Sequence, residues 1–428
     1  MTTFEQDLEN ELADLRSQGL RRELRRVESA QSPHLVVAGQ EFLNFSSNDY
    51  LGLANEGSLK EAARQAIERY GTGAGASRLI CGSLRPHHEL EESLASFKGT
   101  EAALSFSTGY AAALGVIAAV LSKEDIVILD KLVHASIVDA ARLSGAHIRV
   151  FPHNDLNRLE SILAWANKRE AAPEDGSAGE RDSSAPMPAA FKRRRRILVV
   201  TESVFSMDGD HAPLREILQL KEKYGACLMV DEAHATGLYG PRRSGLAEHL
   251  GVGAQIEIQM STLGKALGSS GGCICGSRKL IDLLVNRARS FVFSTAPVPA
   301  AAAAAEAAIR FVQSELGSQR CQLLWDRVDQ VQAGLQSNAA KSSAIVPILV
   351  GGETQAIDAS SRLRDQGVFI PAIRYPTVAR GRARLRLTLS AAHTQAEVAR
   401  ALAALGTLDL AARGAEPKAL LHASPGPV

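Results

Sequence analysis

The sequence is poor in cysteine and contains no C-x-x-C pair. Its five cysteines are an odd number and lack the spacing of zinc ligands, so they indicate neither a metal site nor a disulfide framework. Cys273 and Cys275 stand two apart in an apolar stretch and would share one face of a strand. We expect both to be small buried side chains.

Long hydrophobic runs and a net charge are missing as well. The longest clean apolar run, residues 111–121, is too short to span a membrane. The first eleven residues are rich in acidic side chains and have no apolar core behind a basic start, which argues against a secretory signal and favours a cytoplasmic protein. Lysine and arginine number 48 against 47 acidic residues, and the resulting charge of +1 predicts no general attraction to nucleic acid or membrane.

The chain has 428 residues and 45% hydrophobic content, which predicts a globular protein of two or three domains with a sizeable core. Apolar strand-like segments alternate with helical stretches from about residue 60 to 290; these segments are residues 126–129, 148–151, 197–201, 227–230 and 256–260. This alternation predicts an α/β domain in which helices cover both faces of a mostly parallel sheet.

The rest of the pattern predicts the domain boundaries. Residues 1–55 form an N-terminal segment with one or two amphipathic helices over residues 7–28. Residues 56–300 form the large domain, residues 301–410 form a smaller α+β domain, and residues 411–428 form a flexible tail.

One segment of the large domain departs from the alternation. Residues 168–196 contain no Leu, Ile or Val and are dominated by Pro, Gly, Ser, Ala and charged residues, so we interpret them as a surface insertion. The insertion ends in a basic run, residues 192–196, which is interpreted as a solvated charged surface because no nucleic-acid-binding motif or fold signal accompanies it.

Residues with chemical potential gather where the predicted strands end. Because ligands of open α/β sheets bind outside the carboxyl ends of the strands, these residues are candidates for one site. They are His134, Glu202, Ser206, Asp231, His234, Thr262 and Lys265. Residues 107–110, Ser-Thr-Gly-Tyr, precede an apolar helix whose first N–H groups could bind an anion.

Taken together, these residue types suit one task. A lysine amine can form a Schiff base with an aldehyde cofactor, a carboxylate can keep a pyridine nitrogen protonated, and a helix start can hold a phosphate. The sequence therefore predicts a site for pyridoxal 5′-phosphate, with no metal.

Three other motifs compete with this interpretation. Residues 268–272 match G-x-S-x-G, the nucleophile elbow of serine hydrolases, although an apolar strand-like run follows where a helix is required, and a hydrolase that uses Ser270 remains an alternative. Residues 231–234 spell Asp-Glu-Ala-His, but the chain lacks the phosphate loop that a helicase needs. Residues 71–75 are glycine-rich without the spacing of a dinucleotide site.

The chain resembles the α-oxoamine synthases, a family of fold-type I pyridoxal-phosphate enzymes. The matching segments span roughly residues 20 to 405: residues 44–53, 73–82, 88–91, 107–110, 130–136, 202–213, 231–237, 262–265, 291–297 and 384–393. The resemblance implies a seven-stranded, mostly parallel sheet in the large domain, a smaller α+β domain, and a homodimer with shared active sites.

The resemblance also assigns roles. Lys265 would be the Schiff-base lysine and the base for the substrate α-proton, Asp231 would pair with the pyridinium nitrogen, and His134 would stack on the ring. The residues implied in cofactor binding are Gly109, Tyr110, His134, Glu202, Ser206, Asp231, His234, Thr262, Lys265, Ser294 and Thr295. Ser294 and Thr295 would reach into the site of the neighbouring subunit. The residues implied in substrate binding are Arg21, Asn48, His134, Thr377 and Arg386, with Arg22 as a competing alignment for Arg21.

Within this family, residues 44–53, 75–79 and 202–210 are most similar to the member that joins L-alanine to a pimeloyl thioester in biotin synthesis. The resemblance implies that pimeloyl-CoA or pimeloyl-ACP is the acyl donor. Three alternatives stay open: a sibling of the 2-amino-3-ketobutyrate CoA ligase type that uses glycine or serine, the Ser270 hydrolase, and a binding protein that keeps the fold without catalysis.

Overall fold

A computed structural model describes residues 2–171, 194–336 and 343–408. The chain divides into two compact units. The large unit comprises Gly57–Phe205 and His211–Gln313, and the small unit comprises Met1–Glu56, Ser206–Asp210 and Ser314–Val428. The chain leaves the large unit at Gln313, thirteen residues after the expected boundary, and five residues from the middle of the sequence belong to the small unit.

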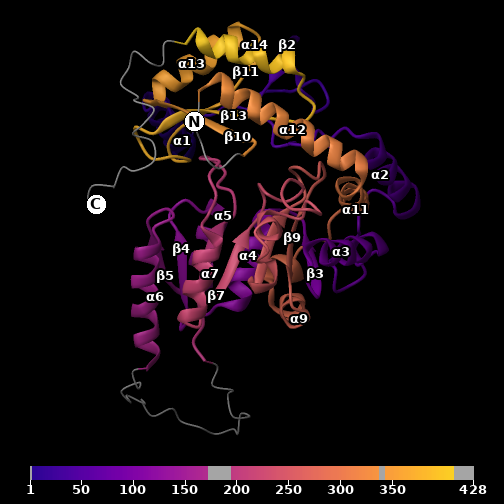
Figure 1. Ribbon diagram of the computed structural model, residues 1–428, viewed down its shortest axis with the longest axis vertical. Coiled ribbons are helices and arrows are strands. Elements are labelled where there is room, and N and C mark those ends of the chain that lie inside the picture. Colours follow the sequence, from indigo (N-terminus) through magenta and orange to yellow (C-terminus); the bar gives the residue numbers. More distant parts are fainter. Residues whose placement is uncertain (1, 172–193, 337–342, 409–428) are drawn as a thin grey trace. The chain divides into compact units, whose positions relative to one another are not determined.

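The large unit is built on a seven-stranded sheet (Figure 1). Its strands, in spatial order, are β3 (Ala102–Phe106), β9 (Gly272–Gly276), β8 (Ile258–Thr262), β7 (Cys227–Asp231), β6 (Ile197–Glu202), β4 (Ile126–Asp130) and β5 (His147–Phe151). Only β9 runs antiparallel to its neighbours, while the pairs β8–β7, β7–β6, β6–β4 and β4–β5 are parallel. The predicted mostly parallel sheet is confirmed.

Helices cover both faces of this sheet because the central strands are apolar on both sides. One core cluster contains Leu129, Val200 and Met229 together with side chains of α4 (Gly109–Val120), α5 (Ala135–Ser144) and α9 (Arg278–Arg287). Three further helices pack against other strands of this sheet or against its opposite face. They are α3 (Arg85–Lys98), α6 (Leu156–Ala171) and α7 (Leu214–Lys223). The remaining helices of the unit are α2 (Gly57–Tyr70), α8 (Leu246–His249), η1 (Gly253–Gln255), α10 (Arg289–Val292) and α11 (Pro299–Gln313).

The small unit contains two three-stranded sheets. The first has the order β1 (His34–Val37), β2 (Gln40–Asn44), β11 (Val368–Phe369), and the second has the order β10 (Ile345–Gly351), β13 (Ala383–Thr388), β12 (Ala372–Ile373). Its helices are α1 (Thr3–Ser17), α12 (Glu315–Gly334), α13 (Glu353–Asp365) and α14 (Gln395–Gly406). The N-terminal segment thus joins the C-terminal part of the chain through the parallel pairing of β2 with β11.

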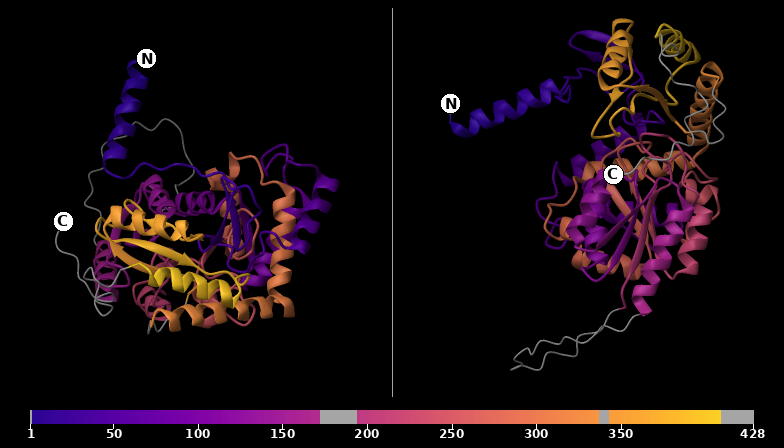
Figure 2. Two further views of the ribbon diagram at one scale, coloured as in Figure 1. Left: turned by 90° about the horizontal axis from the view of Figure 1, so that it is seen from above. Right: turned by 90° about the vertical axis from the view of Figure 1, so that its left-hand side faces the viewer.

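The structure corrects several local expectations. A single helix, Thr3–Ser17, replaces the one or two helices expected over residues 7–28; it has no buried residue and stands clear of the rest of its unit (Figure 2). The strand expected at residues 256–260 lies two residues later, at Ile258–Thr262. The insertion expected from residue 168 begins after α6, which continues to Ala171, and residues 172–193 lie outside the described residues, as does the tail from residue 409.

The core of the large unit offers a test of its packing. Phe97 on α3 is completely buried, so Phe97→Ala is expected to lower the free energy of unfolding by about 3–5 kcal/mol through lost burial and a residual cavity. Phe4→Ala is the control, because Phe4 is 69% exposed and its loss should change the free energy by about 0.5 kcal/mol or less. Urea denaturation measures both, and equal effects would contradict the assignment of Phe97 to the core.

Candidate active site

The carboxyl ends of the central strands bring three of the predicted residues together in the large unit. Glu202 at the end of β6 lies opposite Asp231 at the end of β7. Asp231 in turn pairs with Met260 on β8, two residues before Thr262. Both carboxylates are nearly inaccessible to solvent, with Asp231 4% and Glu202 2% exposed. Neighbouring parallel strands therefore place two acidic groups side by side at one edge of the sheet.

Lys265 and His234 meet over this edge. Lys265 lies in the turn that joins β8 to β9, and the carbonyl of Lys265 accepts a hydrogen bond of 2.8 Å from the N–H of Gly268. His234 follows β7 by three residues and is buried. The Nζ of Lys265 and the Nε2 of His234 are 2.8 Å apart. Lys265, the lysine predicted to form the Schiff base, is thus positioned by His234, a side chain from the turn after Asp231.

Burial raises the pKa of Asp231 above its usual value. The positive charge of Lys265, a hydrogen bond of 2.9 Å from the N–H of Ala233 to Oδ1, and His134 act in the opposite direction, while the neighbouring carboxylate of Glu232 raises the pKa further. A buried carboxylate in this state favours a cationic N–H partner, which a protonated pyridine nitrogen supplies.

His134 is the residue before α5, and its ring caps that helix. The N–H of Ser136 donates to Nδ1 at 3.2 Å, and the hydroxyl of Ser136 lies 2.8 Å from the same atom. Although the residue is exposed overall, desolvation of its ring lowers the pKa of His134, and the charge of Lys265 contributes to the lowering, whereas Asp231 opposes it. A neutral ring suits stacking on an aromatic cofactor better than a charged one.

The start of α4 forms a close-packed cradle. Thr108 caps the helix by accepting a hydrogen bond of 3.0 Å from the N–H of Ala111. A Cβ added to Gly109 would lie 2.5 Å from Cγ2 of Thr262, and one added to Gly272 would lie 2.6 Å from the backbone N of Gly109. The Oγ1 of Thr262 is buried and has no hydrogen-bond partner among the described residues. First-turn N–H groups beside an unsatisfied hydroxyl fit a phosphate group.

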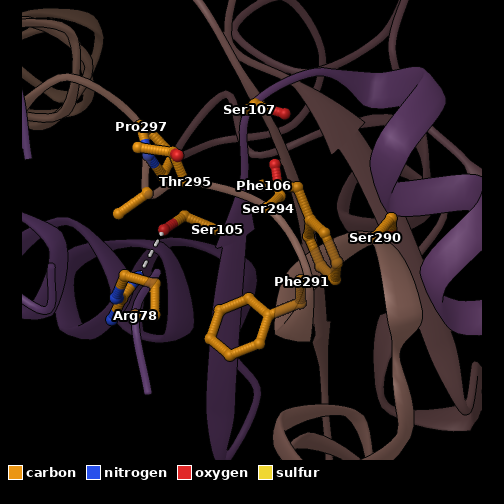
Figure 3. A pocket seen from close by; sticks show the side chains of 10 residues that line it. Arg78, Ser105, Phe106, Ser107, Ser290, Phe291, Ser294, Thr295 and Pro297 are labelled. Atoms are coloured by element: carbon orange, nitrogen blue, oxygen red, sulfur yellow. Dashed lines mark hydrogen bonds between the residues drawn. The ribbon is translucent and has the colours of Figure 1, made fainter. Parts of the chain in front are cut away.

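Ser294 and Thr295 lie in a pocket with Ser107, the residue that precedes this cradle (Figure 3). Thr295 pairs with Ser77, and Arg78 lies in the same pocket, where its guanidinium binds both carboxylate oxygens of Glu91 at 2.8 and 3.0 Å. The guanidinium of Arg78 also lies over the ring of Phe291, with the guanidinium carbon 5.6 Å from the ring centre. In the chain described, Ser294 and Thr295 thus line a pocket with Ser107, and their expected contact with a neighbouring subunit stays a prediction.

A second group of predicted residues lies in the small unit. Arg386 on β13 donates from Nη1 and Nη2 to Oδ1 of Asn48 at 3.2 and 3.1 Å, and from Nε to the carbonyl of Ser206 at 2.7 Å. Arg386 also donates to the hydroxyl of Thr388 at 2.9 Å. The guanidinium is only 5% exposed and faces neutral oxygens, so the part of the chain described here gives it no carboxylate partner. Such a guanidinium can bind a carboxylate of a substrate.

Arg21 and Thr377, the expected acyl contacts, also fall in the small unit. The Nη2 of Arg374 donates to the carbonyl of Arg21 at 3.0 Å, and the N–H of Thr377 donates to the carbonyl of Arg374 at 3.0 Å. Arg21 pairs with Glu23 at 3.2 Å, whereas Arg22 is exposed. Arg374 therefore links the backbone beside Arg21 to the loop that carries Thr377.

Other expected residues differ from their simple interpretation. The exposed Tyr110 donates its hydroxyl to Asp139 at 2.7 Å, which raises the pKa of the phenol. Ser270 is exposed, precedes the strand β9 rather than a helix, and forms no hydrogen bond to a histidine within the described residues. This geometry lacks the strand, turn and helix of a nucleophile elbow.

One buried lysine beside the site was not predicted from the sequence. Lys98 at the end of α3 reaches the turn between Asp231 and His234 and forms a buried ion pair with Glu232. A lysine in the last turn of an amphipathic helix carries no signal of burial, so only the adjacent Asp-Glu pair in the sequence could have suggested a cationic partner.

Comparisons with known proteins agree on the family of similar chains. The family model described as aminotransferase class I and II matches residues 40–405. The 8-amino-7-oxononanoate synthase of Geobacter sulfurreducens is 45% identical over 405 residues, which cover 93% of this chain and 96% of that protein. The protein of the same name from Anaeromyxobacter sp. strain K is 45% identical over 412 residues, 95% of this chain and 96% of that one.

Solved structures show the same fold. The serine palmitoyltransferase of Sphingomonas wittichii has a TM-score of 0.82 and 29% identity over 95% of this chain and 97% of its own. A serine palmitoyltransferase from S. paucimobilis with bound pyridoxal phosphate also has a TM-score of 0.82, with 29% identity over 94% of this chain and 96% of its own. The 8-amino-7-oxononanoate synthase of Francisella tularensis, at 24% identity and a TM-score of 0.67 over 86% of this chain and 97% of its own, is similar in fold.

Proposed function

The chain belongs to the class I and II aminotransferase family and, within it, to the 8-amino-7-oxononanoate synthases, and from this membership we propose that it condenses L-alanine with a pimeloyl thioester. The products are 8-amino-7-oxononanoate, carbon dioxide and the free thiol carrier, as biotin synthesis requires. The observation that carries the proposal is the convergence of Lys265, His234 and Asp231 at the carboxyl edge of the sheet, beside the cradle at Gly109.

The cofactor of this reaction is pyridoxal 5′-phosphate. When bound, it supplies an aldehyde that condenses with amines and a ring that withdraws electrons from the substrate α-carbon. The residues that we expect to hold its phosphate are Gly109, Tyr110, Ser206 and Thr262. The unsatisfied hydroxyl of Thr262 and the steric closeness of Gly109 and Gly272 support this assignment. Asp231 would accept the hydrogen bond of the ring N–H, and His134 would cover one ring face.

Proton movements fall to Lys265. The Nζ of Lys265 would attach the cofactor and, when not so engaged, would take the α-proton of alanine. His234, 2.8 Å from this Nζ, would keep the amine near the reacting carbon and contact the ring oxygen. The carboxylate of Asp231 would hold the proton on the ring nitrogen, and the bound cofactor would supply the electron sink that the chemistry at the α-carbon needs.

Arg386 is expected to bind the carboxylate of alanine, with Asn48 orienting its guanidinium. Arg386→Lys keeps a positive charge but loses the fork of donors, so KM for L-alanine should rise about tenfold while the cofactor stays bound. Steady-state kinetics with varied L-alanine measures this change. Arg382→Lys, at an exposed position on the same segment, is the control and should leave KM unchanged. An unaltered KM in Arg386→Lys would exclude the assigned role.

The acyl donor would meet the segment of Arg21 and the loop of Thr377, which Arg374 joins. Pimeloyl-CoA and pimeloyl-ACP both carry a thioester on a phosphorylated arm, so both suit a segment that contains Arg21, Arg22, Arg25 and Arg26. Comparison of kcat/KM for the two donors, at equal concentrations of thioester, decides which one the enzyme prefers.

We also expect a cytoplasmic homodimer whose two active sites share residues. Within the described ranges no helix is both long and apolar enough to cross a membrane. Phe293, which precedes Ser294 and is 73% exposed, and Ile80, which follows Arg78 by two residues and is 79% exposed, are apolar side chains of the kind that a subunit interface covers. Sedimentation analysis tests the dimer. A mixture of Lys265→Ala and Ser294→Ala subunits tests the sharing, because partial recovery of activity is expected only if residues cross between subunits.

The solved serine palmitoyltransferases at 29% identity make serine the specific alternative substrate. The first experiment is therefore a visible absorption spectrum of the protein with added pyridoxal phosphate, followed by titration with L-alanine, glycine and L-serine. A Schiff-base band that responds to L-alanine at the lowest concentration supports the proposal. A stronger response to glycine or serine would assign the chain to a sibling activity, and absence of any band would overturn the cofactor assignment.

A further inference from the structure

Lys98 is a buried lysine with three oxygen partners. Its side chain is 1% exposed, and its Nζ donates to Oε2 of Glu232 at 2.9 Å, to Oγ1 of Thr236 at 2.8 Å and to the carbonyl of Ser244 at 2.5 Å. An ammonium group has three protons, so these acceptors satisfy it fully. None of the residues assigned above to the cofactor or the substrate takes part in this set.

Glu232 is equally enclosed. Its Oε1 accepts a hydrogen bond of 2.9 Å from the N–H of Ala247, and its side chain is 1% exposed. A Cβ added to Gly245 would lie 2.3 Å from Oε2 of Glu232, so the carboxylate fills the space that the glycine leaves. Thr236, the second partner of Lys98, lies 2.7 Å from the hydroxyl of Ser261 on β8. The cluster therefore links α3, the turn after β7, and β8.

The position of this cluster in the sequence gives it a connection to the cofactor site. Glu232 directly follows Asp231, and the turn from residue 231 to residue 236 carries His234 between the two side chains that Lys98 binds. The N–H groups of Ala235 and Thr236 also bond to the carbonyl of Glu232, at 2.9 and 2.8 Å. Fixing Glu232 and Thr236 thus fixes the turn that presents Asp231 and His234.

Charge supplies a second connection. The carboxylate of Glu232 raises the pKa of Asp231, which burial already raises. The other titratable or charged groups near Asp231 are Lys265, His134, Glu202 and, on β9, Cys273. The positive charge of Lys98 offsets the negative charge of Glu232. Glu232 therefore disfavours the ionised form of Asp231 less than it would without Lys98.

We propose that Lys98 is a positioning residue for the cofactor site: by pairing with Glu232 and Thr236 it holds the turn of Asp231 and His234 and cancels the charge of Glu232, so that Asp231 meets the pyridine nitrogen as an anion. The proposal rests on the proposed function, since it concerns the same site. It assigns to Glu232 the task of binding Lys98 and no direct contact with the cofactor.

The two halves of the pair have opposite expected effects. Lys98→Met leaves the charge of Glu232 uncompensated beside Asp231, which disfavours the anion. The pH at which affinity for pyridoxal phosphate falls on acidification should then rise by about one pH unit, and the affinity below that pH should drop about tenfold. Glu232→Gln leaves the charge of Lys98 uncompensated, which favours the anion, and should shift the same midpoint to lower pH.

The experiment titrates cofactor-free protein with pyridoxal phosphate at a series of pH values and follows the visible band. The proteins are the wild type, Lys98→Met, Glu232→Gln, the double variant and the control Lys221→Met. Lys221 is also buried and pairs with the partly exposed Glu257 at 2.5 Å, but Glu257 accepts a hydrogen bond from the N–H of Leu228 near the amino end of β7, away from Asp231. The double variant carries neither charge and should return close to the wild-type midpoint, while Lys221→Met should leave it unchanged.

Opposite shifts in the single variants, with recovery in the double variant, would support the proposal. Shifts in the same direction, or unchanged midpoints, would overturn it, because a purely structural pair predicts equal loss on removing either partner. Should one single variant fail to fold, the other compared with the double variant carries the same test. A wild-type protein without a visible band would instead overturn the proposed function, so the two failures are distinguishable.

Discussion

The Lys265→Ala protein is expected to lose at least about a thousandfold in kcat for the condensation of L-alanine with pimeloyl thioester. The reason is that one amine has two tasks, the covalent attachment of the cofactor and the transfer of the substrate α-proton. In the described structure the Nζ of Lys265 lies 2.8 Å from His234, whereas Lys98, the other buried lysine near this turn, is fully engaged with Glu232, Thr236 and Ser244. Within the described ranges, Lys98 is therefore not available to take over the tasks of Lys265.

Borohydride reduction provides a readout that is independent of turnover. The wild-type protein incubated with pyridoxal phosphate should gain one cofactor mass on a peptide that contains Lys265, and Lys265→Ala should gain none. Lys279→Ala is the matched control, because Lys279 lies on the exposed side of α9 in the same unit, and its variant should keep the adduct. An adduct and normal activity in Lys265→Ala would show that another lysine carries the chemistry.

Much of the large unit was predictable because its strands are continuous apolar runs. Residues 126–129 and 197–201 read as buried strands and are confirmed as β4 and β6, each one residue longer at the carboxyl end. That added residue is Asp130 in one strand and Glu202 in the other, and both are buried. In the sequence, the first polar residue marks the end of the apolar run. In the structure, hydrogen bonding to the neighbouring strand extends the strand to that polar residue.

The expectations failed where tertiary contacts decide. The strand at Ile258–Thr262 includes Ser261 and Thr262, because their pairing with Cys273 and Gly272 on β9 outweighs their polarity. The strand β3, Ala102–Phe106, was missed, since its five residues, Ala-Ala-Leu-Ser-Phe, include no β-branched side chain. Residues 206–210 belong to the small unit through Arg384, whose Nη1 is 2.5 Å from Oδ1 of Asp208, and no local pattern predicts so distant a partner.

The candidate site also contains residues that were predicted from the sequence and residues that were not. His134, Asp231 and Lys265 were predicted as site residues because strand ends collect polar residues and because the three residue types suit one cofactor. The ion pair of Lys98 and Glu232 was not found, since buried pairs depend on two segments 134 positions apart in the chain. Residues that touch a ligand have a chemical signature, while residues that hold those residues in place are recognised through geometry.

Asp231→Asn is the change with the most informative combination of effects. We expect kcat to fall about a hundredfold or more, because an amide cannot stabilise a protonated ring nitrogen and the ring then withdraws electrons weakly. The phosphate cradle at Gly109 and Thr262 is unaltered, so the variant should still bind pyridoxal phosphate. Asp282→Asn, at an exposed position on α9, is the control and should retain full activity.

Although Asp231→Asn should lower kcat, it should raise the thermal stability of the cofactor-free protein. Burial raises the pKa of Asp231 in the folded state, so the folded protein binds this proton more tightly than the unfolded chain does. The stabilising contribution of the group is therefore present below the pKa of the unfolded chain and is lost as the pH rises through the raised pKa of the folded state. At pH values above that range, Asp231→Asn removes a buried charge and should raise the Tm of the cofactor-free protein, with a difference that shrinks on acidification.

Three measurements on the same protein thus separate function from folding: steady-state turnover, retention of the visible cofactor band, and Tm of the cofactor-free form as a function of pH. Lower turnover together with a higher cofactor-free Tm means that the wild-type chain keeps an unfavourable buried carboxylate which becomes favourable when the pyridinium nitrogen binds. Normal turnover in Asp231→Asn would remove Asp231 from the mechanism. A lower Tm at neutral pH would instead mean that Lys265 and His134 already compensate its charge, so that the carboxylate stabilises the fold before the cofactor arrives.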